Sequence, residues 1–480
     1  MPPAAPAPLP AALLGVLVGR LGADRVLTDP AELVVYESDG STLHDVVPRA
    51  VVFPTTTEEV AAVVTACRAE GVPFVARGAG TGLSGGAMAL QGGVLVALNR
   101  MDKVLELDPA DRRALVQPGV RNLAVSEAAA RHGLYYAPDP SSQAVCTIGG
   151  NVAHNSGGPH TLKYGVTVNH VRGLELVTPL GEVVQVGGPD RPGYDLLALL
   201  TGAEGTLGIV TAVEVALRRV PESVRTLLAA FRDVDAASAA VSAIIGSGLV
   251  PAALELLDDV VVEALEAAFG LSFPEGAGAL LLIESDGPEP GLEEEAVEIE
   301  EVCAAHGALS VRRAADAAER TDLWTARKKA FGALGRVARN YSTQDGVIPR
   351  TRLPEMLAFV REVGARHGLR IANVFHAGDG NLHPCILFDG EDAATRELVS
   401  RAGGEILEHC LRLGGTLSGE HGVGIEKREA MALLFEPDDL LAMKRLREAL
   451  DPEGLCNPDK VLPLGTACGE LDPRRKQVAS

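Results

Sequence analysis

One loop constrains the fold of this 480-residue chain more than any other segment. Residues 77–86 read RGAGTGLSGG, in which five residues are glycine, and they lie between two short apolar runs. Glycine tolerates positive φ, so successive backbone amides can face one concavity and bind an anionic oxygen. A plain tight turn rarely needs so many glycines, so the loop predicts a phosphate-binding site. Arg77 and the hydroxyls of Thr81 and Ser84 can add polar contacts there.

The same loop matches the G-x-G-x-x-G fingerprint of Rossmann folds through Gly80, Gly82 and Gly85, and Asp102 lies near the expected acidic position. A Rossmann loop must open a helix whose N-terminus faces the diphosphate. Residues 85–93 are too short and too rich in glycine for that helix, and a strand is expected directly after them. The sequence therefore indicates a phosphate-binding loop outside the Rossmann class.

Two further glycine-rich pieces follow within the next 140 residues or so. The first runs from Pro138 to Gly158 and contains two glycine pairs, and the second runs from Gly202 to Thr211. A long loop inside a compact domain is more often functional than idle. Each piece alone is a weak signal, but three in this order predict a large ligand with a phosphorylated or planar part.

Short β-rich runs alternate with helices along the chain, which predicts an α+β protein with two mixed domains. The expected domains are an N-terminal helical segment (1–47), a ligand-binding domain (48–222), a second domain (223–465) whose last segment returns to the first, and a polar tail (466–480). Strands are expected at 51–53, 73–77, 94–99, 104–108, 114–117, 171–178, 182–186, 207–217, 279–283, 370–376 and 384–388. Helices are expected at 56–71, 122–132, 235–246, 255–268, 291–306, 353–367, 391–413 and 437–450.

Composition narrows the possible partners. The formal charge of −21 argues against a nucleic-acid partner, because binding to a phosphate backbone needs a basic surface. The seven cysteines are scattered without a C-x-x-C pair, which is typical of a reduced intracellular protein and argues against an iron–sulfur cluster in this chain. Cys146 is expected to be a small packed residue.

The apolar run from Ala11 to Val18 lacks a preceding basic region and is too short to cross a bilayer. It predicts a helix packed on the domain, not a signal peptide. The expected location is the cytoplasm, with peripheral association with a membrane left open and no transmembrane segment.

Histidines and a carboxylate gather in two glycine-framed loops of the second half. Residues 376–383 read HAGDGNLH, and Asp379-Gly380 favours a tight turn that brings His376 and His383 toward one point. Some forty residues later, residues 414–424 read GGTLSGEHGVG and present Glu420 beside His421. Two histidines and one carboxylate form a common open site for zinc or another first-row metal. The alternative is that these are ordinary loop residues.

The segment 48–220 resembles the FAD-binding domain of the vanillyl-alcohol oxidase (PCMH-type) flavoprotein superfamily, in which the first loop holds the FAD diphosphate. The motifs H-x-G-D-G-N-x-H and S-G-E-H-G-V-G resemble those of its D-lactate, glycolate and D-2-hydroxyglutarate dehydrogenase branch. The likeness spans about residues 30–463. It implies an α+β fold with a PCMH-type FAD-binding domain and a C-terminal substrate (cap) domain. It also implies non-covalent FAD, because the first loop has no histidine that could attach the flavin.

The resemblance assigns roles by motif. His376, His383 and Glu420 match the ligands of a divalent metal, expected to be zinc, and His421 matches the catalytic base. Arg327 matches the arginine that binds the substrate carboxylate, and Asn381 is expected to contact the substrate, although an Arg-Lys-Lys run alone is more typical of a solvated helix face. The residues expected to bind FAD lie in the three glycine-rich pieces and near the chain end: Arg77, Gly78, Ala79, Gly80, Thr81, Gly82, Ser84, Pro138, Ser141, Gly149, Gly150, Asn151, Ser156, Gly157, Glu204, Gly205, Ile209 and Asn457.

The implied reaction is oxidation of a small D-2-hydroxy acid to the 2-oxo acid by hydride transfer to FAD. Members that act on 2-hydroxyglutarate place a lysine two residues before the aspartate that matches Asp345, and Thr343 stands here. This favours a monocarboxylate, glycolate or D-lactate. Electron acceptors left open are oxygen, a quinone, a cytochrome and a partner subunit with iron–sulfur clusters. The alternatives are a metal-dependent hydrolase, a non-catalytic flavin subunit of an electron-transfer complex, and a relative that oxidises a sugar lactone without metal.

Overall fold

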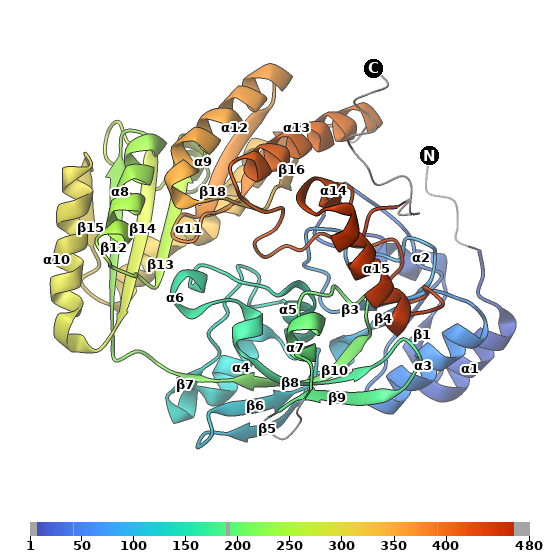
Figure 1. Cartoon of the computed structure of the whole chain (residues 1–480). Helices are drawn as coiled ribbons and strands as arrows, with labels where there is room; N and C mark the ends of the chain where they lie inside the picture. The colour runs from blue at the N-terminus through green and yellow to red at the C-terminus, as the bar shows by residue number, and fades with distance from the viewer. Residues whose placement is uncertain (1–6, 42, 189–192, 391, 465–480) are drawn as a thin grey trace. The chain divides into compact units, whose positions relative to one another are not determined.

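The computed structural model describes residues 7–41, 43–188, 193–390 and 392–464. The expected tail (466–480), and residue 391 at the expected start of one helix, lie outside the described residues. The chain forms two compact units (Figure 1). The first unit comprises Met1–Ser156, Val166–Arg219 and Glu420–Ser480, and the second comprises Gly157–Gly165 and Val220–Gly419.

The first unit contains two main sheets. A four-stranded sheet has the order β1-β2-β4-β3, in which β2, β4 and β3 are parallel. A five-stranded antiparallel sheet has the order β5-β6-β10-β8-β9. Their strands are β1 (Val26–Leu27), β2 (Ala50–Val52), β3 (Phe74–Arg77), β4 (Val94–Ala97), β5 (Val104–Asp108), β6 (Arg113–Val116), β8 (Val171–Val177), β9 (Val183–Gly187) and β10 (Ile209–Ala216).

Helices cover the four-stranded sheet of this unit. Leu13, Leu17 and Leu21 of α1 (Ala11–Leu21) are buried against α3 (Thr57–Ala69), so the N-terminal apolar run is a packed helix as expected. Thr56 caps α3 through the amide of Glu59. The other helices of this unit include α4 (Asn122–Ala129), α5 (Ile148–His154) and α15 (Pro437–Leu450).

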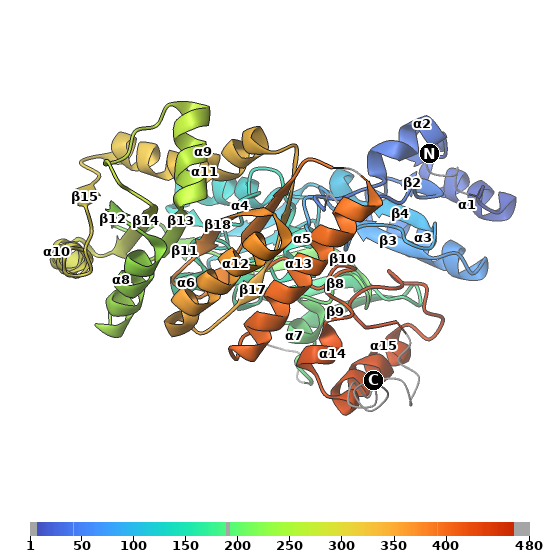
Figure 2. The same cartoon turned by 90° about the horizontal axis from the view of Figure 1, so that it is seen from above.

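The second unit is built on an antiparallel sheet with the order β15-β12-β14-β13-β18-β19-β17, and β20 pairs with both β18 and β16. Helices α9 and α11 lie on one face, and α8, α10 and α12 lie on the other (Figure 2). The strands are β12 (Ser223–Phe231), β13 (Ala253–Asp258), β14 (Ala279–Gly287), β15 (Ser310–Arg313), β16 (Asn340–Thr343), β17 (Gly346–Val347), β18 (Arg370–His376), β19 (Asn381–Leu382) and β20 (Pro384–Phe388). The helices are α8 (Val234–Gly246), α9 (Asp259–Phe269), α10 (Glu289–Ala305), α11 (Ala317–Val337), α12 (Leu353–His367) and α13 (Ala393–Arg412).

Most expected elements are present, and two expectations are wrong. The first residues of the helix expected at 255–268 belong instead to strand β13, and helix α9, whose N-cap is Asp258, covers only Asp259–Phe269. The glycine-rich stretch 138–158, expected as a loop throughout, contains α5, capped by Thr147. The expectation that no Rossmann helix follows the first glycine loop is confirmed, because only turns separate β3 from β4.

Candidate active site

The first glycine loop connects β3 to β4 at the end of the parallel sheet. Gly80 and Gly85 have φ values of 72° and 77°, which a residue with a Cβ rarely adopts. Within the described part of the chain, no amide from Ala79 to Gly86 donates a backbone hydrogen bond. The hydroxyl of Ser84 is buried and has no partner among the described residues. Such a row of amides and a hydroxyl suits a diphosphate.

The glycine-rich pieces pack so closely that larger residues would collide. A Cβ on Gly78 would lie 2.3 Å from Oγ1 of Thr147, and a Cβ on Gly149 would lie 2.6 Å from Cβ of Pro118. A Cβ on Gly85 would lie 2.6 Å from Cδ1 of Ile425. The glycines therefore let segments far apart in sequence come together around the first loop.

Glu204 and Asn457 join the third piece and the chain end to that loop. The Glu204 carboxylate accepts hydrogen bonds from the amides of Val423 (2.6 Å) and Gly424 (2.8 Å). The Asn457 amide group donates to the carbonyls of Gly86 (3.0 Å) and Glu204 (2.8 Å). Both side chains thus hold backbone of the first unit in this structure.

Arg77 and Cys146 have simpler surroundings. Nη1 of Arg77 donates to the carbonyl of Ser38 at 2.8 Å, and burial lowers the pKa of its guanidinium. Cys146 is buried, and burial raises the pKa of its thiol above the ordinary value. The latter agrees with a packed, unreactive cysteine.

Lys460 is a residue of this region that the sequence did not single out. Its side chain is fully buried, and its Nζ donates to the carbonyl of Met88 (2.6 Å) and to Oδ1 of Asn457 (3.2 Å). Burial lowers its pKa to about 8. Its position three residues after Asn457 was the available signal.

The other residues of the second and third glycine-rich pieces that are expected to bind FAD lie in different parts of the structure. Asn151, on α5, is buried and accepts a hydrogen bond from Asn122. Ser156 belongs to the first unit, whereas Gly157 opens the segment Gly157–Gly165 of the second. Ile209 begins β10 and packs in the core of the four-stranded sheet.

A buried hydrogen-bonded triad links the middle of the second unit's sheet to helix α11. Glu255 on β13 is the cross-strand partner of His376 on β18. One carboxylate oxygen of Glu255 lies 2.6 Å from Nδ1 of His376, and the other accepts from Nε of Arg327 at 2.6 Å. Burial by itself would raise the pKa of Glu255, but its contacts with His376 and Arg327 outweigh burial and lower that pKa. Glu255 is a functional candidate that the sequence missed, because its strand was taken for a helix.

Arg327 lies on α11 and is only 4% exposed. Its Nη2 is buried and finds no hydrogen-bond partner among the residues that the structure describes. Leaving a buried guanidinium nitrogen unsatisfied is costly, so such groups call for an explanation. An anionic ligand such as a carboxylate would satisfy it.

The turn between β18 and β19 brings His376 and His383 together. Gly380 has φ 81°, and a Cβ there would lie 2.2 Å from the carbonyl oxygen of Ile348. The two imidazole rings are perpendicular with centroids 5.1 Å apart, and both are buried. Asn381, between them in the chain, is buried, and its Oδ1 has no partner within the described ranges.

The donor set fits a metal ion. Because Nδ1 of His376 faces a carboxylate, the tautomer places the ring's lone pair on Nε2, the arrangement typical of metal-binding histidines. Nδ1 of His383 faces the carbonyl of Gln344 at 3.4 Å, which favours the same tautomer.

Asp345 fixes the loop that leads to the remaining expected ligand. It is fully buried and accepts from the hydroxyl of Ser418 (2.7 Å) and the amide of Gly419 (3.1 Å). Glu420 and His421, which follow directly, begin the last segment of the first unit. Oε1 of Glu420 and Nε2 of His421 lie 4.0 Å apart.

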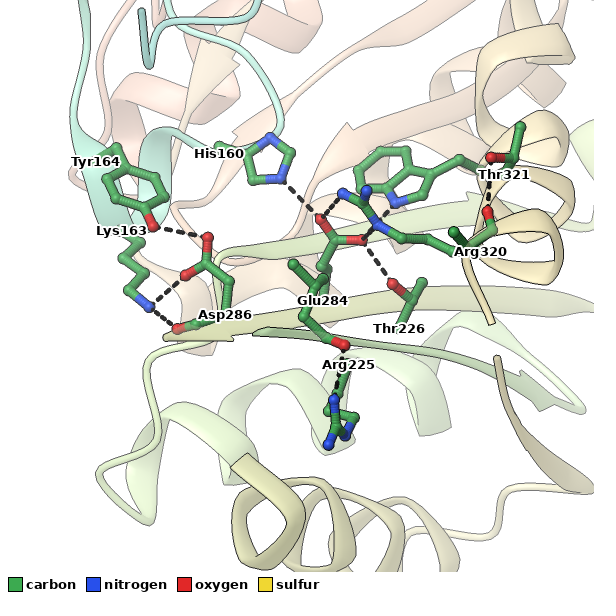
Figure 3. A network of polar contacts seen from close by, with 12 residues as sticks. His160, Lys163, Tyr164, Arg225, Thr226, Glu284, Asp286, Arg320 and Thr321 are labelled. Atoms are coloured by element: carbon green, nitrogen blue, oxygen red, sulfur yellow. Dashed lines mark hydrogen bonds and ion pairs between the residues drawn. The ribbon is translucent and has the colours of Figure 1, made fainter. Parts of the chain in front are cut away.

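A second carboxylate docks helix α11, which carries Arg327. Glu284 on β14 accepts from Arg320 (2.8 and 2.7 Å), Trp324 (2.7 Å) and Thr226 (2.6 Å), and it lies 3.2 Å from Nε2 of His160 (Figure 3). The neighbouring Asp286 accepts from Tyr164 at 2.7 Å and pairs with Lys163. These contacts fix both α11 and the segment Gly157–Gly165 on the sheet.

Comparison with known proteins agrees with this organisation. A family model described as "FAD binding domain" matches residues 48–187, and one described as "FAD linked oxidases, C-terminal domain" matches residues 220–461. The chain is 46% identical over 448 residues to the glycolate oxidase subunit GlcD of Escherichia coli K12, covering 93% of this chain and 90% of that protein. It is 35% identical over 425 residues to a D-lactate dehydrogenase of Anaerostipes hadrus, covering 86% and 89%.

Solved structures show the same fold at low identity. The 4-ethylphenol oxidase from Gulosibacter chungangensis superposes with a TM-score of 0.79 at 19% identity, covering 96% of this chain and 99% of that one. A p-cresol methylhydroxylase gives a TM-score of 0.77 at 17% identity, covering 94% and 96%. The expected PCMH-type fold is therefore confirmed. No helix in the described ranges is both long and apolar enough to cross a membrane.

Proposed function

Because this chain belongs to the family of FAD-linked oxidases and is an FAD-dependent oxidoreductase, we propose that it oxidises a small D-2-hydroxy acid to the 2-oxo acid. The observation that carries the proposal is the buried Arg327, held by Glu255 with its Nη2 unsatisfied among the described residues, beside a pair of buried imidazoles. Arg327 would recognise a carboxylate, and the site formed by the two imidazoles would recognise an adjacent hydroxyl.

Arg327 binds the substrate carboxylate in this proposal. A guanidinium is permanently charged and offers forked donors that match a carboxylate. Asn381 contacts the substrate from the turn between β18 and β19. Holding the substrate at these points fixes Cα and its hydrogen, and such positioning can lower a barrier by several kcal/mol.

His376, His383 and Glu420 are the proposed ligands of a divalent metal, with zinc as the first candidate. The amide of Gly419 donates a hydrogen bond to the buried Asp345. Because Glu420 is the next residue in the chain, its backbone is held close to this fixed point. A metal held by these three side chains would supply Lewis-acid polarisation of the substrate hydroxyl, and FAD bound in the first unit would supply the hydride acceptor. His421 takes the hydroxyl proton, a role suited to an imidazole whose ordinary pKa lies near neutrality.

The first glycine loop is the proposed site of the FAD diphosphate, held without a covalent bond. Its available amides and the Ser84 hydroxyl support this assignment. Gly149, Gly150, Gly205 and Asn457 would let the cofactor approach the backbone.

Glycolate and D-lactate are the proposed substrates. Thr343 is buried, with Oγ1 3.5 Å from Sγ of Cys385, and offers no charge to a second carboxylate. The relatives named as a glycolate oxidase subunit and a D-lactate dehydrogenase support the same two acids. A hydrolase has no use for FAD-linked oxidase domains, so that alternative is set aside.

The electron acceptor is proposed to lie outside this chain. All six cysteines in the described ranges are buried and none of them forms a disulfide bond, and the sequence has no C-x-x-C pair that could hold a cluster. The relative from Escherichia coli is named as a subunit, which supports a partner subunit as acceptor.

Anaerobic titration of the FAD-loaded protein tests the proposal. Glycolate or D-lactate should bleach the oxidised flavin absorbance, L-lactate should not, and metal analysis should give about one divalent ion per chain. A flavin that no 2-hydroxy acid reduces would refute the proposed function.

A further inference from the structure

The carboxylate of Glu255 lies between two groups with different proposed tasks. It is completely buried on β13, in the register position opposite His376. One oxygen contacts Nδ1 of His376 and the other contacts Nε of Arg327, each at 2.6 Å. The two partners come from different elements, strand β18 and helix α11.

We infer that Glu255 is a positioning residue shared by the metal site and the substrate-carboxylate site. By binding Nδ1 it sets the His376 tautomer and aims Nε2 at the metal, and by binding Nε it sets which edge of Arg327 faces the substrate. This inference rests on the roles proposed above for His376 and Arg327. It adds that one carboxylate fixes both, so the metal and the substrate carboxylate are held in a constant spatial relation.

The geometry makes this division of labour specific. A guanidinium that gives Nε to one carboxylate keeps its terminal nitrogens for a second, and Nη2 is the buried atom without a partner among the described residues. Carboxylates that orient metal-binding histidines typically contribute about tenfold to hundredfold to metal affinity. A carboxylate that only stabilised the fold would not control either binding constant.

The substitution Glu255→Gln tests the inference with almost no change in volume. A glutamine offers one acceptor and one donor group, whereas both partners donate, so it must lose at least one of the two contacts. The same strand supplies a matched control, Asp258→Asn. Oδ2 of Asp258 accepts from the amide and side chain of Asn373 on β18 at 2.8 Å, and no described contact joins Asp258 to Arg327 or His376.

Two equilibrium constants are measured on FAD-loaded protein. Zn²⁺ affinity is obtained on chelator-treated protein by competition with a chromophoric chelator. Affinity for propionate, a carboxylate without a hydroxyl, is obtained from the perturbation of the flavin absorbance. We expect Glu255→Gln to weaken both by about tenfold or more, and Asp258→Asn to leave both within about twofold while lowering the unfolding midpoint.

If Glu255→Gln weakens only one of the two affinities, for Zn²⁺ or for propionate, or weakens neither, the shared role is overturned. A wild-type protein that binds neither Zn²⁺ nor propionate overturns it as well. If Glu255→Gln does not yield FAD-loaded protein, Glu255→Asp takes its place. It keeps the charge but withdraws the carboxylate by one methylene, so the same double loss is expected. Neither constant requires turnover, so a protein that binds both ligands but is reduced by no hydroxy acid refutes the proposed function and leaves this inference standing.

Discussion

Replacing Glu284 with glutamine should destabilise the second unit and leave the first almost untouched. The wild-type carboxylate is 1% exposed and accepts from Thr226, Trp324 and Arg320 (Figure 3). A glutamine keeps one acceptor and turns a donor group toward donors, so the buried indole N–H or the guanidinium loses its partner.

The expected cost follows from those partners. A hydrogen bond to a charged group contributes about 1.5–3 kcal/mol, and an orphaned buried donor costs about 1–3 kcal/mol. Because the Arg320 side chain is 43% exposed, water can satisfy it, and its ion pair adds little. We therefore expect Glu284→Gln to lower the free energy of unfolding of this unit by about 2–3 kcal/mol.

The sequence provides a probe for this unit alone. Trp324 is the single tryptophan of the chain, and its indole donates directly to Glu284. Its fluorescence in urea should show a midpoint about 1 M lower for the variant, since m is on the order of 2 kcal/mol per M. Flavin fluorescence, which reports release of FAD, should begin to rise at the same urea concentration as in the wild-type protein if the first unit unfolds independently.

Arg225→Gln is the matched control. Arg225 precedes Thr226 on β12, but its partners Glu289 and Glu293 are 51% and 60% exposed. Exposed ion pairs contribute about 0–1 kcal/mol, so the tryptophan midpoint should hardly move. Equal midpoints for Glu284→Gln and the wild-type protein would refute the reasoning from buried donors.

Further predictions concern pH and the proposed site. Burial would raise the pKa of Glu284, but Arg320 and His160 outweigh burial and lower that pKa. The stability that the Glu284 carboxylate contributes is therefore present above the ordinary glutamate pKa of about 4.3 and is lost as the pH falls below that value. The difference in urea midpoint between the wild-type protein and Glu284→Gln should shrink at this acidic pH. His421→Ala should retain FAD but lose turnover, and near-normal turnover would contradict the proposed base. Arg327→Lys should raise KM by about tenfold or more through loss of a forked contact, whereas an unchanged KM would exclude it from substrate binding. Dialysis against a chelator should abolish reduction by D-lactate and zinc should restore it; full activity without metal would contradict the proposed site.

The fold was predictable where local chemistry agreed with the final structure. The strands before and after the first glycine loop, and the helix over 353–367, follow directly from their apolar patterns and caps. The absence of a Rossmann helix was readable because glycines and a strand leave no room for one.

The failure at β13 has a physical cause. All six residues of this strand are buried, so its sequence ALELLD lacks the alternation of a half-exposed strand and resembles a helix. Its two acidic residues strengthen that false impression, because buried carboxylates are rare unless they are paired. Their partners, Arg327, His376 and Asn373, come from distant elements. Glu255 could not be recognised as a functional candidate from the sequence, because its contact partners lie far away along the chain.

The candidate site divides in the same way. His376, His383 and the turn at Gly380 were predictable because spacing and glycine chemistry act over eight residues. Asp345 and Lys460 were not, because each acts on backbone far away in sequence. The residues proposed to act on the substrate could be found from sequence motifs, whereas the residues proposed to orient them became visible only in the folded structure.

Glu255 and Glu284 show how two buried carboxylates on adjacent strands can differ in purpose. The donors around Glu284 come from Thr226, Trp324 and Arg320, which are anchored on its own sheet and on α11, and none of the three appears among the expected ligand-binding residues. Both donors of Glu255 are expected to bind ligands, and one of them, Arg327, keeps a buried nitrogen without a partner in the described part of the chain. A network in which every buried donor already has an acceptor only stabilises the fold, because it leaves no donor for a ligand to bind. Arg327, which Glu255 fixes, keeps a buried nitrogen that a ligand could satisfy, so this criterion assigns Glu255 to the proposed active site and Glu284 to the network that supports it.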